Sequence, residues 1–241
     1  MASSLKSKNN TLVIALGGSV LFPDKINVQL IIKLKRLFKK ITEGRRIKLI
    51  LIVGGGYPAR NYQTAAKKIH PGVSQIELDE IGIAATRFNA ELIKIIFGSL
   101  AAKKVVYSEN LLKKPIDKIT VISGWTPGCS TDTIAVRAAK KLKLKLVIIA
   151  GRPTHVYTHD FIRFKMAKPL MNILWKNYRK LIPDVWSPGM PSPVDPIAAR
   201  EAQKNNIDAI VIGGKNIENL ESLLLGRKFK GTLISNKNLV L

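Results

Sequence analysis

The chain has 241 residues, of which 46% are hydrophobic, and its 40 Lys and Arg outnumber its 16 Asp and Glu, giving a formal net charge of +24. This length and apolar content suit one large α/β domain or two closely joined lobes. A run of about 18 uncharged apolar residues is lacking, so we expect no membrane span. Cys129 is the only cysteine, which excludes an intrachain disulfide and favours a cytoplasmic protein. We expect residues 1–10 to form a disordered tail, because they lack the apolar centre of a secretory signal.

Positive charge is clustered, and one of the clusters contains a single acidic residue, Glu43. The basic residues of this cluster are Lys33, Lys35, Arg36, Lys39, Lys40, Arg45, Arg46 and Lys48. A surface of this charge attracts polyanions and steers anionic ligands. Two interpretations stay open: a solvated helix face, or a surface that binds RNA or another polyanion.

Apolar runs alternate with amphipathic stretches through the first half of the chain. Residues 11–16 and 47–53 are predicted to be buried strands. Asn27 is the predicted N-cap of a helix that continues to about Thr42 and is ended by Gly44. The following predicted elements are helices at 57–69 and 74–97, short strands at 105–107 and 119–122, and a helix capped by Ser130 or Thr131 that ends at Leu142.

The second half continues the alternation after an irregular segment. Its predicted elements are a strand at 144–149, irregular chain at 151–160, a helix at 167–181, a proline-rich loop at 183–193, a helix at 196–205, a strand at 207–212, a helix at 217–225 and a strand at 232–234. Strands that alternate with helices predict a mainly parallel sheet covered on both faces.

Three glycine-rich segments follow predicted strands at residues 16–19, 54–56 and 124–128. Glycine has no Cβ, so backbone N–H groups in such a turn can approach a ligand closely. A helix that begins there adds a dipole that favours an anion. Ligands of parallel sheets bind at the carboxyl ends of the strands. The three turns therefore predict a site for more than one phosphate, although none has the Gly-Lys-Ser/Thr ending of a nucleoside triphosphate loop or a full dinucleotide fingerprint.

Five segments between Thr11 and Ser235 together resemble the amino-acid-kinase superfamily, and within it the archaeal-type uridylate (UMP) kinases. The segments are Leu16-Gly17-Gly18-Ser19-Val20-Leu21, Val53-Gly54-Gly55-Gly56 with Ala59-Arg60, Asp79-Glu80-Ile81-Gly82-Ile83 with Thr86-Arg87 and Asn89-Ala90, Pro127-Gly128 with Ser130-Thr131-Asp132, and Val194-Asp195-Pro196 with Ala198-Ala199-Arg200. The third segment is the most diagnostic, because that helix separates UMP kinases from relatives that act on glutamate, aspartate or carbamate.

The resemblance implies a three-layer α/β/α sandwich formed by a single domain over residues 11–241. In it, about 11–143 bind the UMP acceptor and about 144–241 bind ATP with Mg²⁺. It also implies transfer of the γ-phosphoryl group of ATP to UMP, giving UDP, in a homo-oligomer that is often a hexamer. In phosphoryl transfer the protein mainly positions the two substrates and neutralises the charge on the phosphates.

The resemblance also implies the residues of the site. Those expected to bind phosphate are Gly17, Gly18, Ser19, Gly54, Gly55, Gly56 and Arg60, and those expected at the acceptor are Asp79, Ser130, Thr131 and Asp132. Arg60 is suited to two parallel hydrogen bonds with a phosphate. Spacing alone leaves Asp79 equally open to interpretation as an exposed helix carboxylate, and residues 130–132 as an ordinary helix cap.

Two positions depart from the family pattern. Ala15 stands where family members carry a charged residue, and Thr154 stands where they carry the aspartate that organises the catalytic cations. We therefore assign no catalytic residue and no resident metal site, and we expect weak phosphoryl transfer. The alternative function is that of a degenerate protein of this fold that binds RNA or a ribonucleoprotein through region 33–48.

Overall fold

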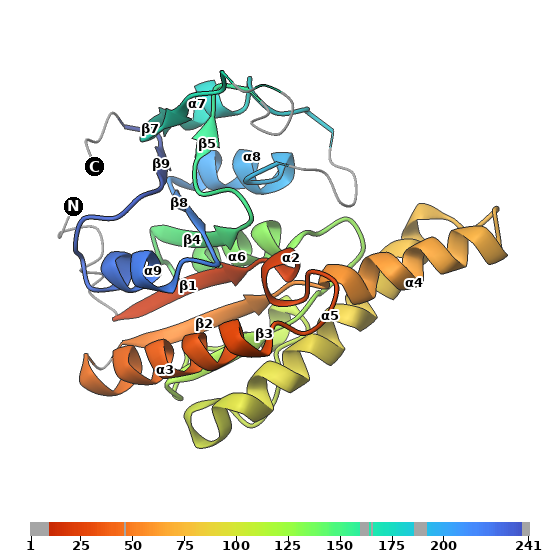
Figure 1. Ribbon diagram of the computed structural model, residues 1–241, viewed down its shortest axis with the longest axis horizontal. Coiled ribbons are helices and arrows are strands. Elements are labelled where there is room, and N and C mark those ends of the chain that lie inside the picture. The colour runs from red at the N-terminus through yellow and green to blue at the C-terminus, as the bar shows by residue number, and fades with distance from the viewer. Residues whose placement is uncertain (1–9, 46, 160–163, 165, 186–191, 238–241) are drawn as a thin grey trace.

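A mostly parallel sheet runs through the centre of the fold (Figure 1). This computed structural model describes residues 10–45, 47–159, 164, 166–185 and 192–237. Within those residues the sheet has the strand order β3-β2-β1-β4-β8-β9-β7, and only β8 and β9 pair in antiparallel fashion. The strands are β1 (Thr11–Leu16), β2 (Lys48–Val53), β3 (Ile119–Ile122), β4 (Leu146–Gly151), β7 (Asn172–Leu174), β8 (Asp208–Gly213) and β9 (Thr232–Ser235). A small antiparallel sheet joins β5 (Val156–Tyr157) to β6 (Pro169–Leu170).

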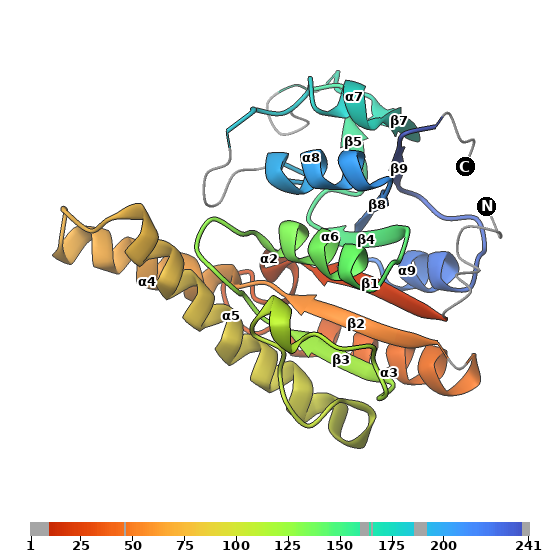
Figure 2. The same ribbon diagram turned by 180° about the vertical axis from the view of Figure 1, so that it is seen from behind.

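Helices cover both faces of the sheet, which confirms the predicted three-layer α/β/α sandwich (Figures 1 and 2). One face carries α3 (Val28–Gly44), α5 (Gln75–Phe97) and α9 (Ile217–Leu224). The other face carries α6 (Thr131–Lys141) and α8 (Pro196–Asn205). The remaining helical segments are α2 (Gly18–Leu21), α4 (Gly56–Ile69), α7 (Trp175–Tyr178), and the 3₁₀ turns η1 (Gly98–Leu100) and η2 (Glu109–Leu111).

The side chains of β1 alternate between the two apolar layers. Leu12, Ile14 and Leu16 pack toward α3, α5 and α9, whereas Val13 and Ala15 pack toward α6 and α8. This alternation follows from the two-residue period of a strand. Because helices cover both faces, every residue of β1 is buried, as is typical of a parallel sheet.

Helix N-termini are fixed by the side chains that the sequence offers there. The Asn27 side chain accepts a hydrogen bond from the Leu30 N–H at 3.2 Å, which confirms the predicted N-cap of α3. Ser74 and Glu77 form a reciprocal capping box at the start of α5. Ser130, one of the two predicted candidates, caps α6.

The predicted helix at 167–181 is wrong. The segment contains β6, β7 and only the four-residue helix α7. Pro169 interrupts any helix at this position, and β7 pairs with β9 in the register Asn172↔Leu233, so a partner distant in sequence decides its structure. The strand predicted at 105–107 is reduced to an isolated bridge between Val106 and Ile122. Conversely, the irregular segment predicted at 151–160 contains β5.

Several sequence predictions fall on residues outside the described part of the chain. These are the tail at 1–9, Arg46 of the basic stretch, and residues 186–191 of the proline-rich loop. No helix among the described residues is long and apolar enough to cross a membrane.

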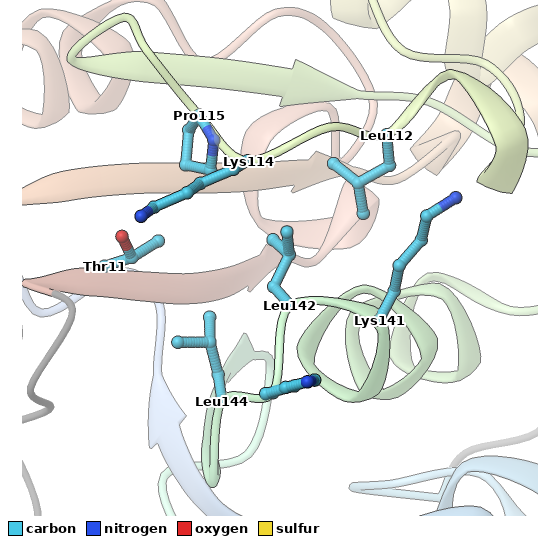
Figure 3. A pocket seen from close by; sticks show the side chains of 8 residues that line it. Thr11, Leu112, Lys114, Pro115, Lys141, Leu142 and Leu144 are labelled. Atoms are coloured by element: carbon cyan, nitrogen blue, oxygen red, sulfur yellow. The ribbon is translucent and has the colours of Figure 1, made fainter.

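A hollow of about 330 Å³ opens beside the amino-terminal end of β1 (Figure 3). Leucine and lysine side chains dominate its wall, which is formed by Thr11, Leu112, Lys114, Pro115, Lys141, Leu142, Lys143 and Leu144. Parallel strands present their ligands at the opposite, carboxyl edge. Because no glycine-turn residue lines the hollow, we do not assign it to the predicted phosphate site.

Candidate functional site

The first two glycine turns lie against each other at the carboxyl ends of β1 and β2. A Cβ atom built on Gly18 would lie 2.2 Å from the Gly56 nitrogen, and one built on Gly54 would lie 2.4 Å from the Gly18 nitrogen. Gly56 also has φ +63°, a conformation that favours glycine. Glycine is therefore required at these positions by backbone-to-backbone contact, whatever ligand binds there.

Hydrogen bonding divides the predicted phosphate-binding glycines into two groups. The Gly17 N–H donates to the Ala150 oxygen at 3.0 Å, and the Gly54 N–H donates to the Leu16 oxygen at 3.1 Å. These two bonds extend the ladders between β1 and β4 and between β2 and β1. Among the hydrogen bonds of the described residues, none uses the N–H groups of Gly18, Ser19, Gly55 or Gly56. Four donors thus remain for a ligand.

The third glycine turn differs, because side chains of α5 occupy the N–H groups of its two glycines. The Gly124 N–H donates to Thr86 Oγ1 at 2.7 Å, and the Gly128 N–H donates to Asp79 Oδ2 at 2.8 Å. Asp79 was expected at the acceptor; here its carboxylate holds the turn at residues 124–128 in place. Both glycine N–H groups of this turn are therefore occupied, unlike those of Gly55 and Gly56.

Asn89 of α5 supports the second glycine turn. It is 3% exposed, and its Nδ2 donates to the Gly54 oxygen at 3.0 Å and to the Gly55 oxygen at 2.9 Å. The sequence marks Asn89 only as part of a family segment and gives it no role. A polar side chain on the buried face of a helix is expected to be hydrogen-bonded, and this is the sequence signal that could have identified Asn89.

Arg60 lies on α4, one turn after the second glycine turn. Its side chain is exposed, and Nη2 donates to the Pro23 oxygen at 3.1 Å. This bond ties α4 to the segment that leaves α2. A guanidinium group has five N–H donors, so the remaining ones are available to a phosphate.

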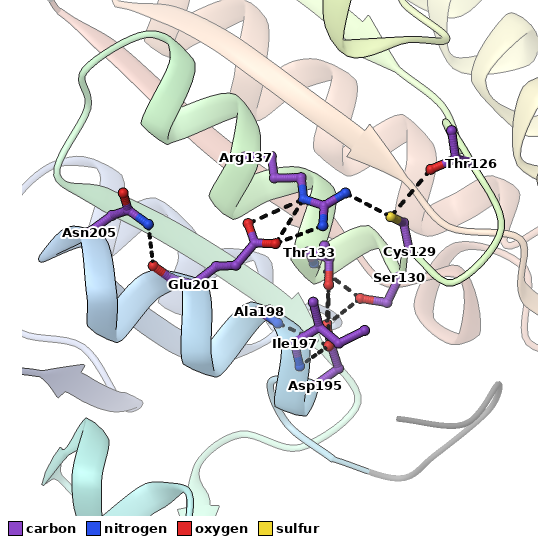
Figure 4. A network of polar contacts seen from close by, with 10 residues as sticks. All are labelled: Thr126, Cys129, Ser130, Thr133, Arg137, Asp195, Ile197, Ala198, Glu201 and Asn205. Carbon is purple, nitrogen blue, oxygen red and sulfur yellow. Dashed lines mark hydrogen bonds and ion pairs between the residues drawn. The ribbon is translucent and has the colours of Figure 1, made fainter. Parts of the chain in front are cut away.

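The N-termini of α6 and α8 meet in a network of polar contacts (Figure 4). Ser130 Oγ accepts from the N–H groups of Asp132 and Thr133 at 3.0 and 3.1 Å and donates to Asp195 Oδ2 at 2.5 Å. Asp195 in turn accepts from the Ile197 and Ala198 N–H groups and so caps α8. Ser130 therefore acts as a helix cap, the structural alternative that the spacing of residues 130–132 had left open.

A second link between α6 and α8 lies further along the two helices. Arg137 Nε and Nη2 donate to the Glu201 carboxylate, with a shortest distance of 2.7 Å (Figure 4). Arg137 Nη1 also donates to Cys129 Sγ at 3.0 Å. The Arg137 and Glu201 side chains are 30% and 26% exposed, so solvent weakens the ion pair. We interpret the pair as a contact that fixes the spacing of the two helices and contributes little to the free energy of unfolding.

Asp132 is the carboxylate of this region whose charge is disfavoured. It is half-buried at the second position of α6. Burial, and then repulsion from the Asp195 carboxylate, raise the pKa of Asp132 well above its ordinary value, while a backbone hydrogen bond from Asp195 offsets part of this. A carboxyl group in such a place gains from a nearby cation.

Comparison with known proteins identifies the family. The sequence model of the Amino acid kinase family matches residues 10–213. The chain belongs to the amino acid kinase family. It is 31% identical over 229 residues to a uridylate kinase of Methanoregula boonei, covering 94% of this chain and 96% of that relative. A uridylate kinase of Methanosarcina barkeri is 32% identical over 227 residues, covering 88% and 91%.

Solved structures agree with the sequence relatives. The structure of a uridylate kinase from Archaeoglobus fulgidus matches with a TM-score of 0.78 at 29% identity, covering 93% of this chain and 99% of that one. A UMP kinase from Bacillus anthracis matches with a TM-score of 0.75 at 20% identity, covering 95% and 96%, which supports the fold alone. The resemblance to archaeal uridylate kinases predicted from the five segments is confirmed.

The two departures from the amino acid kinase pattern have defined positions. Ala15 is buried within β1 in an apolar cluster, where an unpaired charge is costly. Thr154 lies beside Gly213 at the end of β8, because a Cβ on that glycine would meet the Thr154 Cγ2 at 2.8 Å. Its hydroxyl contacts the Tyr157 hydroxyl at 3.0 Å. Thr154 thus lies at the carboxyl edge of the sheet.

Asp132→Asn is expected to stabilise the ligand-free protein at neutral pH. A raised pKa in the folded state means that folding favours the protonated carboxyl, so the wild type is penalised as pH rises through that pKa. The variant carries no such penalty. Its advantage in urea unfolding should therefore be largest at pH 7–8 and should vanish below about pH 4, the pKa range of an unfolded aspartate. Asp117→Asn, at an exposed aspartate, is the control, and a destabilised Asp132→Asn at pH 7 would contradict this account of Asp132.

Proposed function

We propose that this protein transfers the γ-phosphoryl group of ATP to UMP, giving UDP. The observation that carries the proposal is the contact between two glycine turns that leaves the N–H groups of Gly18, Ser19, Gly55 and Gly56 without acceptors at the carboxyl edge of the sheet. Backbone N–H groups in this setting bind phosphate oxygens. The uridylate kinases described above align with nearly the whole length of this chain, and this similarity supports UMP as the phosphate acceptor.

The acceptor and donor nucleotides occupy different parts of the single domain. Residues from about 11 to 143 hold UMP, because the free N–H groups and Arg60 belong to this part. Residues from about 144 to 241 hold ATP at the ends of β4 and β8. Since β1 pairs with β4, the two parts share one sheet and the two phosphates can face each other across the β1–β4 boundary. Such alignment is the main requirement of phosphoryl transfer.

The residues present fit a cation that arrives with ATP. The described part of the chain has no group of three or more His, Cys, Asp or Glu side chains that could hold a metal ion. Mg²⁺ at phosphoryl-transfer sites uses only one or two carboxylates together with phosphate oxygens. Asp132 is the carboxylate that we propose, because a cation would relieve the burial and repulsion that disfavour its charge. When bound, Mg²⁺ neutralises charge on the transferring phosphoryl group.

The alternative function, RNA binding through region 33–48, receives no support from the relatives or the structural matches. The basic side chains Lys33, Lys35, Arg36, Lys39 and Lys40 are exposed on α3, and Lys40 pairs with Glu221 at 2.6 Å. Their field favours the approach of any anion, including a nucleotide. We place the protein in the cytoplasm, with both of its nucleotide substrates.

UMP is expected to raise the melting temperature, because a ligand that binds only the folded state stabilises it by about 2.7 kcal/mol at 100 times its Kd. Arg60→Ala should remove most of this rise, since a hydrogen bond to a charged group contributes roughly 1.5–3 kcal/mol. The control is Arg36→Ala, which removes an exposed arginine from α3. An unchanged UMP effect in Arg60→Ala would show that Arg60 does not bind the phosphate, and no effect in the wild type would remove UMP as a ligand.

We further propose that the protein is a homo-oligomer, with the hexamer implied by the family resemblance, and that α5 forms a contact between subunits. Phe88 and Ile95 are 80% and 69% exposed. They lie seven residues apart, and therefore on the same side of the helix. Exposed apolar side chains aligned in this way are typical of an interaction surface.

Phe88→Glu is expected to reduce the molar mass measured by light scattering, because it places a charge in the apolar contact. Val28→Glu, which changes a residue 55% exposed on α3, should leave the assembly unchanged. A wild-type protein that is monomeric at all concentrations would refute the oligomer, and an assembly that survives Phe88→Glu would refute the α5 contact.

A further inference from the structure

We infer that Asn89 is a positioning residue that directs two backbone N–H groups, those of Gly55 and Gly56, toward the acceptor phosphate. The inference rests on the proposed function and names a residue to which that function gives no role. Asn89 lies on α5, behind the second glycine turn, and is almost fully buried. Its Nδ2 donates to two consecutive carbonyl groups, those of Gly54 and Gly55, at 3.0 and 2.9 Å.

The geometry of the peptide bond shows in which direction the Gly55 and Gly56 N–H groups point. In a planar trans peptide the C=O and the N–H of the same unit point to opposite sides. The described residues contain no cis peptide bond. The Gly54 carbonyl shares its peptide unit with the Gly55 N–H, and the Gly55 carbonyl shares its unit with the Gly56 N–H. Because Asn89 holds both carbonyls toward α5, both N–H groups point away from α5.

The backbone at this turn has the conformation of an anion-binding nest. Gly55 is in the right-handed helical region, with φ −73° and ψ −36°, and Gly56 follows with φ +63°. A residue of the first kind followed by one of the second makes successive N–H groups converge on an anion. The next N–H, that of Tyr57, donates to the Phe22 oxygen at 2.7 Å and anchors the far side of the turn. The Gly55 and Gly56 donors are thus fixed from two sides and left unoccupied.

The same helix has the opposite effect on the third glycine turn. Thr86 and Asp79 accept from the N–H groups of Gly124 and Gly128, so those donors are occupied. Asn89 binds carbonyls and exposes N–H groups, whereas Thr86 and Asp79 bind N–H groups. The hydrogen bonds of α5 therefore leave two glycine N–H groups free in the second turn and occupy two in the third.

The test compares Asn89→Leu with Gln63→Ala. Leucine has the same number and branching of side-chain heavy atoms as asparagine and is larger, but it cannot donate a hydrogen bond. Gln63 Nε2 donates to the Leu78 oxygen at 2.8 Å, so Gln63→Ala removes the same kind of amide-to-carbonyl bond near α5 without touching the glycine turn. Asn89→Asp is a second variant, with the shape of asparagine and, when ionised, no donor.

Two measurements are made on each protein. Backbone ¹⁵N NMR follows the Gly55 and Gly56 amides during titration with UMP and, separately, with inorganic sulfate. Steady-state kinetics gives the KM values for UMP and ATP. In the wild type and in Gln63→Ala both amides should shift with either anion. In Asn89→Leu the shifts should be lost, and the KM for UMP should rise about tenfold or more while the KM for ATP stays unchanged.

The outcomes separate this inference from the proposed function. If Asn89→Leu keeps the wild-type KM for UMP and the wild-type amide shifts, the inference is overturned while UMP kinase activity stands. If UMP is not phosphorylated but sulfate shifts both amides in an Asn89-dependent way, the proposed function fails and the role of Asn89 stands. If neither anion moves the two amides in the wild type, the inference is overturned, even where Asn89→Leu fails to fold.

Discussion

Close contact between the backbones of two glycine turns is the constraint on which the site depends. β1 and β2 are parallel neighbours in the register Leu16↔Val53, so the turns that follow them leave the sheet side by side. A side chain on Gly18 or Gly54 would force these turns apart, because its Cβ would lie within 2.5 Å of backbone atoms of the facing turn. The close approach gathers several N–H groups into a small volume. We propose that a phosphate contacts donors from both turns.

The charged groups near the two glycine turns are arranged in a way that suits the binding of nucleotides. The net charge of +24 favours the approach of nucleotides, and the backbone donors and Arg60 are the groups that we propose as the phosphate ligands. Two carboxylates lie at the N-termini of α6 and α8, where Asp195 is held by hydrogen bonds and Asp132 is not fully compensated. A cation that enters with ATP would compensate the negative charge of Asp132. The buried, apolar surroundings of Ala15 show that β1 itself provides no charge for this purpose.

Those features that depend on local sequence could be predicted, and those that depend on distant partners could not. The alternation of strands and helices, the Asn27 cap and the glycine turns follow from residue types and short spacing. The pairing of β7 with β9 joins residues about 60 positions apart, so a local pattern at 167–181 could not reveal it. Local sequence also cannot show which backbone N–H groups are free to bind a ligand. The Gly17 N–H is occupied because β1 pairs with β4. The role of Asn89 depends on carbonyls 34 and 35 residues earlier.

The most direct test of the central claim is the formation of UDP by the purified protein. Wild-type enzyme is incubated with UMP, ATP and Mg²⁺, and the nucleotides are quantified by chromatography. The account predicts that UDP and ADP appear in equal amounts, at a turnover below the roughly 1–100 s⁻¹ of ordinary kinases, because charges are missing at Ala15 and Thr154. Consumption of ATP without UDP, or no consumption of ATP at saturating UMP, would contradict it.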